Sequence, residues 1–288
     1  TDATGNRETC TTTLAVNDET PPAVSCPAGT SANAAAACQA AVPNVLASVT
    51  VTDNCDITPT LSQSPAAGTL VSLGATTITV TATDDASNSS SCTTTFTVAD
   101  TTAPLVTCPI GSTVNANPGC QGEVPDVLGG VTVSDNCDTT PTLSQNPAAG
   151  SLIGPGTHLI TVTATDDAGN VSTCTTTLTV VETTPPVVTC PAGTSVAANA
   201  NCQAAIPNVL GGVTAADNCD STPTLSQSPA AGTAVGLGTH TITVTATDDA
   251  GNTASCTTAF TVTDTTPPVV ALTGSAAITV ECHGNFTD

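Results

Sequence analysis

The sequence has almost no cationic and almost no aromatic side chains. Its 288 residues contain a single Lys or Arg, Arg7, against 23 Asp and Glu, which gives a formal net charge of -22. Trp, Tyr and Met are absent, and only three Phe are present. A nucleic-acid-binding protein needs a basic surface, and a phosphoryl-transfer enzyme needs Lys or Arg around the phosphates. The composition therefore excludes nucleic-acid partners and argues against phosphate chemistry.

Two residue types are abundant instead, since the chain contains 62 Thr and 14 Cys. Thr is β-branched and favours strands. Charged residues make up only 8% of the chain, which does not match the composition of disordered proteins. No run approaches the roughly 18 consecutive apolar residues of a membrane helix. The sequence therefore predicts an all-β protein with no membrane span in this segment.

The cysteines recur at a fixed interval. Cys26, Cys108 and Cys190 lie 82 positions apart, and Cys38, Cys55 and Cys92 recur at the same interval. This period indicates a tandem array. We expect three complete repeats at residues 20–101, 102–183 and 184–265. Residues 1–19 correspond to the C-terminal part of a preceding repeat, and residues 266–288 to the N-terminal part of a following immunoglobulin-like repeat. We therefore expect the chain to be a window onto a longer protein.

Within each repeat, apolar and Thr residues alternate in the runs TTITVTATDD and CTTTFTV, which is typical of strands with one buried face. The segment DDASN or DDAGN between the runs predicts a hairpin turn. We expect no helix, and an extended or irregular path for the Ala run at 34–37. Short strands separated by turn residues favour a β-sandwich of immunoglobulin size.

Three motifs together resemble the hyalin repeat (HYR), an immunoglobulin-like extracellular module. They are DxTxPxVxCP at 100–109, DNCD at 53–56 and TATDDAGNxxxC at 163–174, and the resemblance covers all three repeats. It implies tandem immunoglobulin-like β-sandwich domains with two disulfides each, strung as beads on a rod, with an adhesive or structural role outside cells. Residues 266–288 depart from the pattern because they lack the first Cys of the repeat.

The four cysteines of a repeat allow three pairings, and the sequence does not choose among them. Their spacing contains no CxxC motif, which argues against zinc. We expect first-to-fourth and second-to-third bonds, which imply an oxidising, extracellular or cell-surface location. These are Cys26–Cys92 and Cys38–Cys55, Cys108–Cys174 and Cys120–Cys137, and Cys190–Cys256 and Cys202–Cys219. Cys10 and Cys282 would pair with residues outside the sequence.

Acidic residues concentrate at the junctions between repeats. In an immunoglobulin-like sandwich the turn after the penultimate strand lies at the pole of the incoming linker, and by resemblance the DNCD loop lies there too. Converging carboxylates with few cations suit Ca²⁺, so we expect calcium at these joints. The expected ligands are Asp18, Glu19, Asp53, Asp56, Asp84 and Asp85; Asp100, Asp135, Asp138, Asp166 and Asp167; and Glu182, Asp217, Asp220, Asp248 and Asp249. The alternative is that these residues only shape turns and keep the chain soluble.

Near-identical repeats, short Pro-bearing linkers and disulfides predict a structural segment of a long extracellular protein, forming a fibre or the stalk of a surface adhesin. Its expected partners are neighbouring repeats and copies of itself. The alternative is a ligand-binding adhesion module that recognises a protein or glycan, with copy-specific residues such as Glu123, Asp126 and His158 as the place to look. No repeated Ser, His and Asp set indicates an enzyme. Asn88, Asn170 and Asn285 begin glycosylation sequons.

Overall fold

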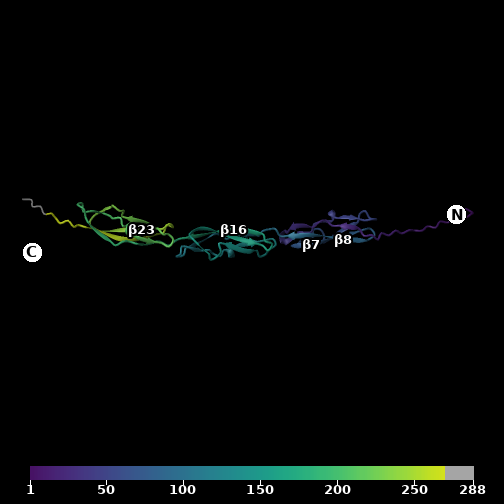
Figure 1. Cartoon of the computed structure of the whole chain (residues 1–288), viewed down its shortest axis with the longest axis horizontal. Coiled ribbons are helices and arrows are strands. Elements are labelled where there is room, and N and C mark those ends of the chain that lie inside the picture. The colour runs from purple at the N-terminus through teal and green to yellow at the C-terminus, as the bar shows by residue number, and fades with distance from the viewer. Residues whose placement is uncertain (270–288) are drawn as a thin grey trace, which may run out of the picture. The chain divides into compact units, whose positions relative to one another are not determined.

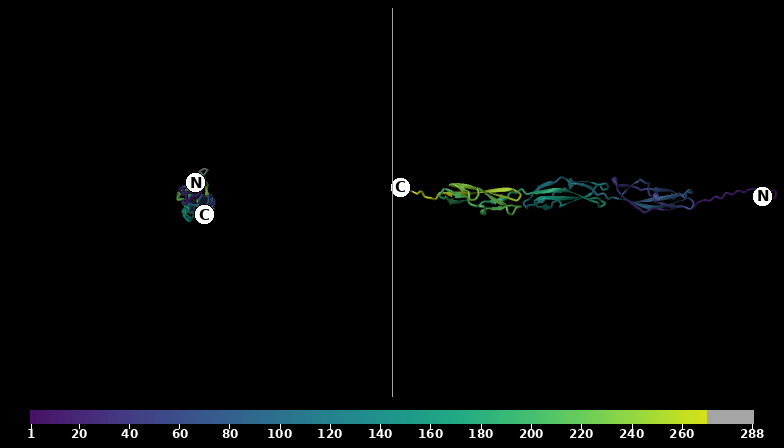
Figure 2. Two further views of the ribbon diagram at one scale, coloured as in Figure 1. Left: turned by 90° about the vertical axis from the view of Figure 1, so that its right-hand side faces the viewer. Right: turned by 90° about the horizontal axis from the view of Figure 1, so that it is seen from above.

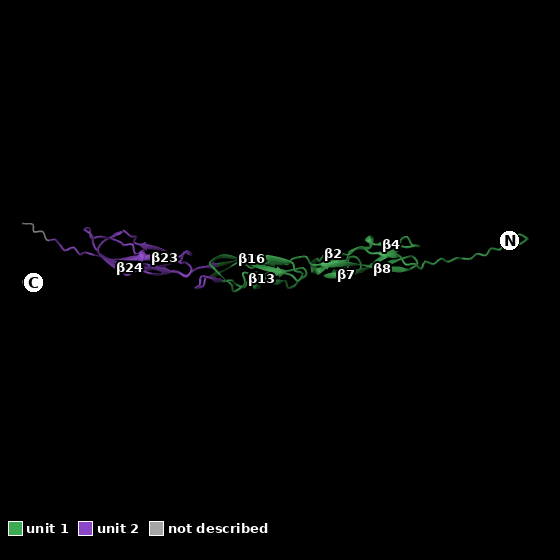
Figure 3. Cartoon of the chain, in the orientation of Figure 1, with its two compact units in different colours: residues 1–114, 123–179 green, residues 115–122, 180–288 purple. Residues whose placement is uncertain are grey.

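The computed structural model describes residues 1–269. The chain divides into two compact units, coloured separately in Figure 3. Unit 1 comprises residues 1–114 and 123–179, and unit 2 comprises residues 115–122 together with the chain from residue 180. The first repeat and most of the second therefore belong to unit 1, and the third repeat belongs to unit 2.

Each repeat is built from eight strands. The first contains β1 (Ala23–Ser25), β2 (Thr30–Asn33), β3 (Gln39–Ala41), β4 (Thr50–Thr52), β5 (Thr60–Ser64), β6 (Leu70–Ser72), β7 (Gly74–Thr83) and β8 (Ser89–Ala99). The second contains β9 (Leu105–Thr107), β10 (Ser112–Asn115), β11 (Gly122–Glu123), β12 (Thr132–Ser134), β13 (Thr142–Asn146), β14 (Leu152–Ile153), β15 (Gly156–Thr165) and β16 (Val171–Val181). The third contains β17 (Val187–Thr189), β18 (Thr194–Ala197), β19 (Ala204–Ala205), β20 (Thr214–Ala216), β21 (Thr224–Ser228), β22 (Ala234–Val235), β23 (Gly238–Thr247) and β24 (Thr253–Thr263).

Each repeat has one four-stranded sheet and two two-stranded sheets. In the first repeat the large sheet has the order β2-β8-β7-β5, and the small sheets are β1-β4 and β3-β6. β2 pairs with β8 in parallel, whereas β7 pairs with both β5 and β8 in antiparallel fashion. The other repeats repeat this order as β10-β16-β15-β13 and β18-β24-β23-β21. The predicted all-β, sandwich-like tandem array is confirmed.

The predicted hairpin of the first repeat is formed by its two longest strands, β7 and β8 (Figure 1). Their register runs from Gly74 opposite Val98 to Thr83 opposite Ser89. The turn closes where the backbone N–H of Asp84 donates to the carbonyl oxygen of Asn88 at 3.1 Å. The right-hand view of Figure 2 shows the matching long strands of the third repeat, β23 and β24, running side by side in green to yellow.

The core lies on one face of this hairpin, as the alternation of the sequence predicts. Ile78 and Val80 of β7 are fully buried and pack with Phe96 and Val98 of β8. A disulfide beside this core joins Cys26, which follows β1, to a cysteine of β8. The first-to-fourth bonds Cys26–Cys92, Cys108–Cys174 and Cys190–Cys256 are all present, each with Cα atoms 5.7 Å apart.

Within residues 1–269, helical structure is limited to short 3₁₀ turns. They are η1 (Ala36–Cys38), η2 (Leu46–Ser48), η3 (Leu128–Gly130) and η4 (Leu210–Gly212). The Ala run at 34–37 is irregular, because Ala37 within η1 has a φ of 63°. Among the described residues, no helix is long and apolar enough to cross a membrane.

Candidate functional site

A tight hairpin lies beside the end of β8 in the first repeat. The backbone N–H of Ala34 donates to the carbonyl oxygen of Ala99 at 2.8 Å, which holds the hairpin against the end of that strand. Ala35 then donates its N–H to Gln39 at 2.8 Å and accepts from Cys38 at 3.1 Å. Cys38 has a φ of 59°, in the left-handed region that non-glycine residues seldom adopt. The hairpin therefore carries Cys38 at the end of the repeat where β8 finishes.

The DNCD segment of the second repeat meets this hairpin within unit 1. Cys137 forms a disulfide with Cys38, and their Cα atoms lie 4.6 Å apart. The side-chain amide of the adjacent Asn136 donates to the carbonyl oxygen of Ala34 at 3.4 Å. Asp135 shapes the loop, because its Oδ1 accepts the backbone N–H of Cys137 at 2.9 Å. One disulfide and the hydrogen bonds of the Asn136 amide to the carbonyl oxygens of Ala34 and Ala35 therefore join the end of the first repeat to the DNCD loop of the second.

Unit 2 contains the same junction one period later. Cys120 forms a disulfide with Cys219, with Cα atoms 5.1 Å apart. Cys120 has a φ of 60°, and Asp217 Oδ1 accepts the N–H of Cys219 at 2.8 Å. The inter-repeat disulfide is therefore a property of the repeat, because independent copies of the motif form it in both units.

The expected second-to-third bonds, Cys38–Cys55, Cys120–Cys137 and Cys202–Cys219, are wrong. The reason is the position of the two loops in one repeat. The hairpin with Cys38 adjoins the end of β8, whereas Cys55 lies near Asp84 at the opposite end of the ten-residue strand β7. Such a strand spans about 30 Å, and a disulfide requires Cα atoms within about 7 Å. In place of the three expected bonds, two bonds join neighbouring repeats, and Cys55 and Cys202 are unpaired.

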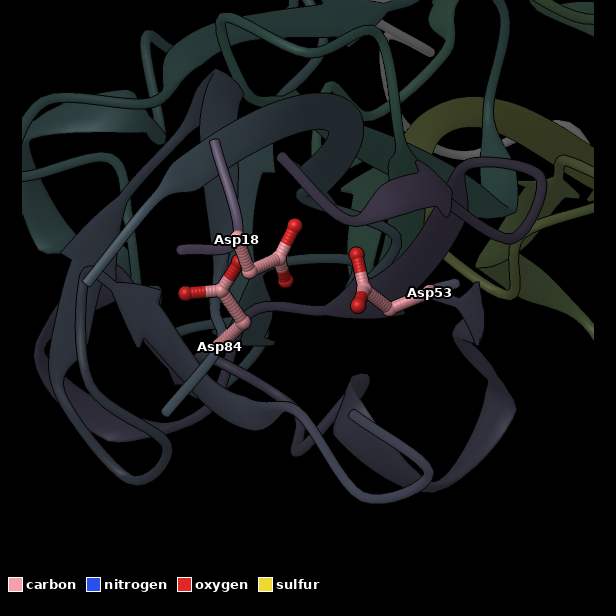
Figure 4. Close-up of side chains that lie close together, drawn as sticks. All are labelled: Asp18, Asp53 and Asp84. Atoms are coloured by element: carbon pink, nitrogen blue, oxygen red, sulfur yellow. The ribbon is translucent and has the colours of Figure 1, made fainter. Parts of the chain in front are cut away.

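Three carboxylates converge at the DNCD end of each repeat. In the first, one oxygen from each of Asp18, Asp53 and Asp84 lies within 4.8 Å of the others. Figure 4 shows these side chains pointing toward one another from three separate segments. We call this set and its two counterparts the carboxylate clusters. The counterparts are Asp100, Asp135 and Asp166 in unit 1, and Glu182, Asp217 and Asp248 in unit 2.

The other predicted ligands lie outside the three clusters. Asp56 and Asp85 contact each other instead, since Asp56 Oδ2 accepts the backbone N–H of Asp85 at 3.2 Å. Asp138 bonds the N–H of Asp167 in the same way at 3.1 Å. Glu19 is exposed. The predicted residues outside the clusters are Glu19, Asp56, Asp85, Asp138, Asp167, Asp220 and Asp249.

Hydrogen bonds hold the carboxylates in place. Both oxygens of the buried Asp84 accept from Asn88, Oδ1 from the backbone N–H at 2.8 Å and Oδ2 from the side-chain amide at 2.9 Å. That amide also donates to the carbonyl oxygen of Asp18 at 3.1 Å. The side chain of Asn170 likewise donates to Asp166 at 2.9 Å. The amide nitrogens of these two sequons therefore organise the clusters, whereas the sequon at Asn285 lies outside the described residues.

One buried carboxylate oxygen in each cluster accepts no hydrogen bond. Asp53 Oδ2, Asp135 Oδ2 and Asp217 Oδ2 are buried and accept no hydrogen bond. The other oxygen of Asp53 accepts the backbone N–H groups of Asp56 and Cys55, which lower the pKa of Asp53. Burial alone would raise the pKa of Asp135, but the backbone N–H groups of its own loop outweigh burial and lower it. Asp53 and Asp135 are therefore ionised near neutral pH. Each cluster offers oxygen atoms of the kind that Ca²⁺ prefers.

Cys55, Cys202 and Cys10 are unpaired among the described cysteines, and all three are exposed. Desolvation raises the pKa of the Cys55 thiol, as do the negative charges of Asp18, Asp53 and Asp84. Cys55 and Cys202 occupy the repeat positions of Cys137 and Cys120, which are disulfide-bonded. The sequence contained a signal for the inter-repeat bond. By the resemblance, the DNCD loop lies at the pole that the incoming linker reaches, and this pole faces the preceding repeat.

The model of the HYR domain family matches residues 17–98, 99–180 and 181–263. Hyalin of Strongylocentrotus purpuratus is 31% identical over 293 aligned residues, covering 97% of this chain and 24% of that protein. A serine-rich adhesin for platelets of Staphylococcus aureus is 36% identical over 126 residues, covering 38% of this chain and 9% of the adhesin.

A crystal structure of mouse cadherin-23 domains EC22–24 covers 85% of this chain and is itself covered to 99%, with a TM-score of 0.40 and 13% identity. The hyalin and adhesin relatives and the disulfide-rich immunoglobulin-like domains indicate an extracellular or cell-surface location. The expected resemblance to the hyalin repeat is confirmed, and the chain belongs to the HYR domain family.

Proposed function

We propose that this chain is a spacer segment of a long extracellular repeat protein, within a fibre or within the stalk of a surface adhesin, and that it has no catalytic role. The observation that carries the proposal is the disulfide Cys38–Cys137 with its counterpart Cys120–Cys219. Each bond adds a second covalent connection between repeats that the peptide linker already joins. Two connections restrict rotation about the linker, which is the property that a spacer requires.

The linker is itself anchored, which supports the same proposal. Pro104 is buried, and its carbonyl oxygen accepts a hydrogen bond from the hydroxyl of Ser172 in β16. Pro22 and Ser90 make the same contact in the first repeat. Pro also fixes its own φ angle. The freedom of the joint is therefore limited by backbone chemistry, by side-chain contacts and by the disulfide.

Two of the three residues singled out for a ligand-binding module, Asp126 and His158, make contacts that recur in another repeat. Asp126 Oδ1 accepts the N–H of Leu128 at 3.0 Å, as Asn44 Oδ1 accepts the N–H of Leu46 at 3.1 Å. His158 bonds the carbonyl oxygen of Gly154 at 2.8 Å, and His240 makes the equivalent contact in the third repeat. These similarities favour the spacer over a module in which one repeat recognises a protein or glycan.

Small-angle X-ray scattering tests the spacer. Replacing Cys38, Cys137, Cys120 and Cys219 by Ser should broaden the distribution of interatomic distances and lower the maximum dimension. A matched variant with Ser at the unpaired Cys55 and Cys202 keeps both inter-repeat disulfides, and its monomer should scatter like the monomer of the native chain. Identical curves for all three proteins would overturn the proposal.

The second part of the proposal is that Ca²⁺ binds the carboxylate clusters and strengthens the joints. It is supported by the convergence of three carboxylates without a neighbouring Lys or Arg, and by the buried, unpartnered oxygen of Asp53, Asp135 and Asp217. Asp135 lies two residues before Cys137, so the cation and the disulfide would act on one loop. Water molecules would complete the six to eight oxygen ligands that Ca²⁺ takes.

A melting experiment with Ca²⁺ or with a chelator tests this part. Ca²⁺ at about 100 times its dissociation constant should stabilise the folded chain by about 2.7 kcal/mol per occupied site. The variant Asp53→Asn/Asp135→Asn/Asp217→Asn should lose most of that gain. Asp126→Asn is the matched control, because Asn occupies the equivalent positions 44 and 208. If the melting temperature of the native chain were the same with Ca²⁺ and with the chelator, the proposed calcium sites would be excluded.

A further inference from the structure

Cys202 and Cys55 are the two unpaired members of the cysteine positions that otherwise form the inter-repeat bond. Cys38, Cys120 and Cys202 occupy the hairpin position of their repeats, and Cys55, Cys137 and Cys219 occupy the DNCD position. The bonds join each hairpin position to the DNCD position 99 residues later. This rule leaves one hairpin cysteine and one DNCD cysteine without a partner.

The hairpin around Cys202 has the geometry of its bonded counterpart. The N–H of Cys202 donates to Asn199 at 2.9 Å, as the N–H of Cys120 donates to Asn117 at 2.9 Å. The φ angle is 58° at Cys202 and 60° at Cys120. This left-handed backbone is therefore present in the third repeat without the disulfide that it serves in the second.

The DNCD loop around Cys55 is equally well formed. Its N–H donates to Asp53 Oδ1 at 2.9 Å, the distance that also separates Cys137 from Asp135 Oδ1. The neighbouring Asn54 amide lies 3.2 Å from Cys55 Sγ, as the Asn136 amide does from Cys137 Sγ. The bonded cysteines are half-buried, whereas Cys55 and Cys202 are exposed and accessible to a partner.

We propose that Cys202 and Cys55 are complementary half-sites for covalent coupling to further HYR repeats, Cys202 to a DNCD cysteine and Cys55 to a hairpin cysteine. The partner repeat comes either from another copy of this chain, joined head to tail, or from an adjacent repeat of one longer chain. The proposal extends the spacer function from the joints within this segment to the joints at its two sides. The coupling depends on Cys55 and Cys202, whereas the spacer depends on the bonds Cys38–Cys137 and Cys120–Cys219, so the two proposals fail separately.

The coupling is an oxidation, and oxidised glutathione is a suitable oxidant. The Cys202 thiolate attacks one sulfur of glutathione disulfide, which forms a mixed disulfide and releases one glutathione thiolate. The partner thiolate then attacks the sulfur of Cys202 in the mixed disulfide and releases the second glutathione. Two protein thiols are thereby oxidised to one disulfide, glutathione disulfide is reduced to two glutathione molecules, and the two thiol protons end on these products.

The test starts from the full chain with Cys10→Ser and Cys282→Ser, incubated natively in a glutathione redox buffer. The first arm concerns a second copy. This protein should form a ladder of covalent oligomers on non-reducing electrophoresis, and the ladder should collapse to monomer on reduction. Adding Cys55→Ser or Cys202→Ser should abolish the ladder. An equimolar mixture of those two variants should stop at the dimer, and peptide mapping should find Cys202 joined to Cys55.

The second arm concerns an adjacent repeat. A chain in which residues 266–288 are replaced by a further copy of residues 184–265 should join Cys202 to the added copy of Cys219 within one molecule. A head-to-tail ladder in the first arm supports coupling between copies, and an internal bond in the second supports coupling along one chain. Cys202–Cys202 dimers as the main product, or unpaired thiols in both arms, would overturn the proposal.

Discussion

The disulfide Cys26–Cys92 lies within one repeat, and Cys38–Cys137 lies between two, although both use the same chemistry. The first joins the end of β1 to β8 beside a buried core that contains one Phe. The second joins the hairpin at the end of one repeat to the DNCD loop of the next, and both of its cysteines are half-buried. The cysteines of this repeat therefore have two separate tasks. One pair stabilises the domain, and the other restrains the neighbouring domain.

The largest effect should follow from removing the bond within a repeat. Cys26→Ala/Cys92→Ala opens a loop with a sequence separation of 66, so we expect a loss of about 4 kcal/mol in the free energy of unfolding of the first repeat. Chemical denaturation followed by hydrogen exchange of β7 and β8 measures the loss. Cys55→Ser is the control and should change the free energy by less than about 0.5 kcal/mol.

Removing the bond between repeats should have a local effect instead. In Cys38→Ser/Cys137→Ser, the amides of Ala35 and Cys38 should exchange at least about tenfold faster, because the strained hairpin loses its covalent anchor. The core amides of β7 should keep their protection. Hydrogen exchange with mass spectrometry reports both regions at once. Equal loss of protection in the core would show that the two disulfides do not have separate tasks.

Acid should destabilise the DNCD loops whether or not their cysteine is bonded. The pKa is lowered at both Asp53 and Asp135, so these carboxylates stabilise the fold fully above the ordinary pKa of 3.8. That contribution is lost as the pH falls through the lower folded-state pKa. Denaturation between about pH 5 and pH 2 should show a shallower loss of stability in Asp53→Asn/Asp135→Asn than in the native chain. If the stability of the variant and of the native chain fell equally steeply with pH, Asp53 and Asp135 would not contribute to the acid sensitivity of the fold.

The smallest effect concerns the reactivity of the unpaired DNCD cysteine. Desolvation and the carboxylate cluster raise the pKa of Cys55, so little thiolate is present at pH 8 and iodoacetamide should alkylate Cys55 more slowly than it alkylates Cys10. Asp18→Asn/Asp84→Asn removes two of the negative charges and should accelerate the reaction at Cys55 alone. Mass spectrometry of timed samples measures both rates. Equal rates in the native chain would show that the cluster does not act on this thiol.

Much of the fold could be predicted from local patterns. Alternation of Ile78, Val80 and Ala82 with Thr identified a strand with one buried face, and all three side chains are fully buried. The Asp- and Asn-rich turn correctly predicted the hairpin formed by the strands on either side of it. Five or six carboxylates per joint were predicted to converge, because by the resemblance the linker and two turns of the sandwich share a pole, and three of them do so in each repeat.

The pairing of Cys38 could not be predicted in the same way. Cys55 lies 17 positions from Cys38 and Cys137 lies 99 positions away, and nothing in the sequence favours the larger separation. The parallel pairing of β2 with β8 instead carries the chain to the end of β8 just before Cys38. A parallel neighbour is a long-range contact, and no local pattern in the sequence encodes it.

The period, the long strands, their buried faces and the acidic junctions are encoded locally, because side-chain alternation and turn chemistry act over a few residues. Which cysteines meet and which carboxylates share a cluster depends on the folded chain. Both depend on which loops lie at the same end of the sandwich, and a disulfide or a shared cation is decided by distances of a few ångströms between segments far apart in the chain.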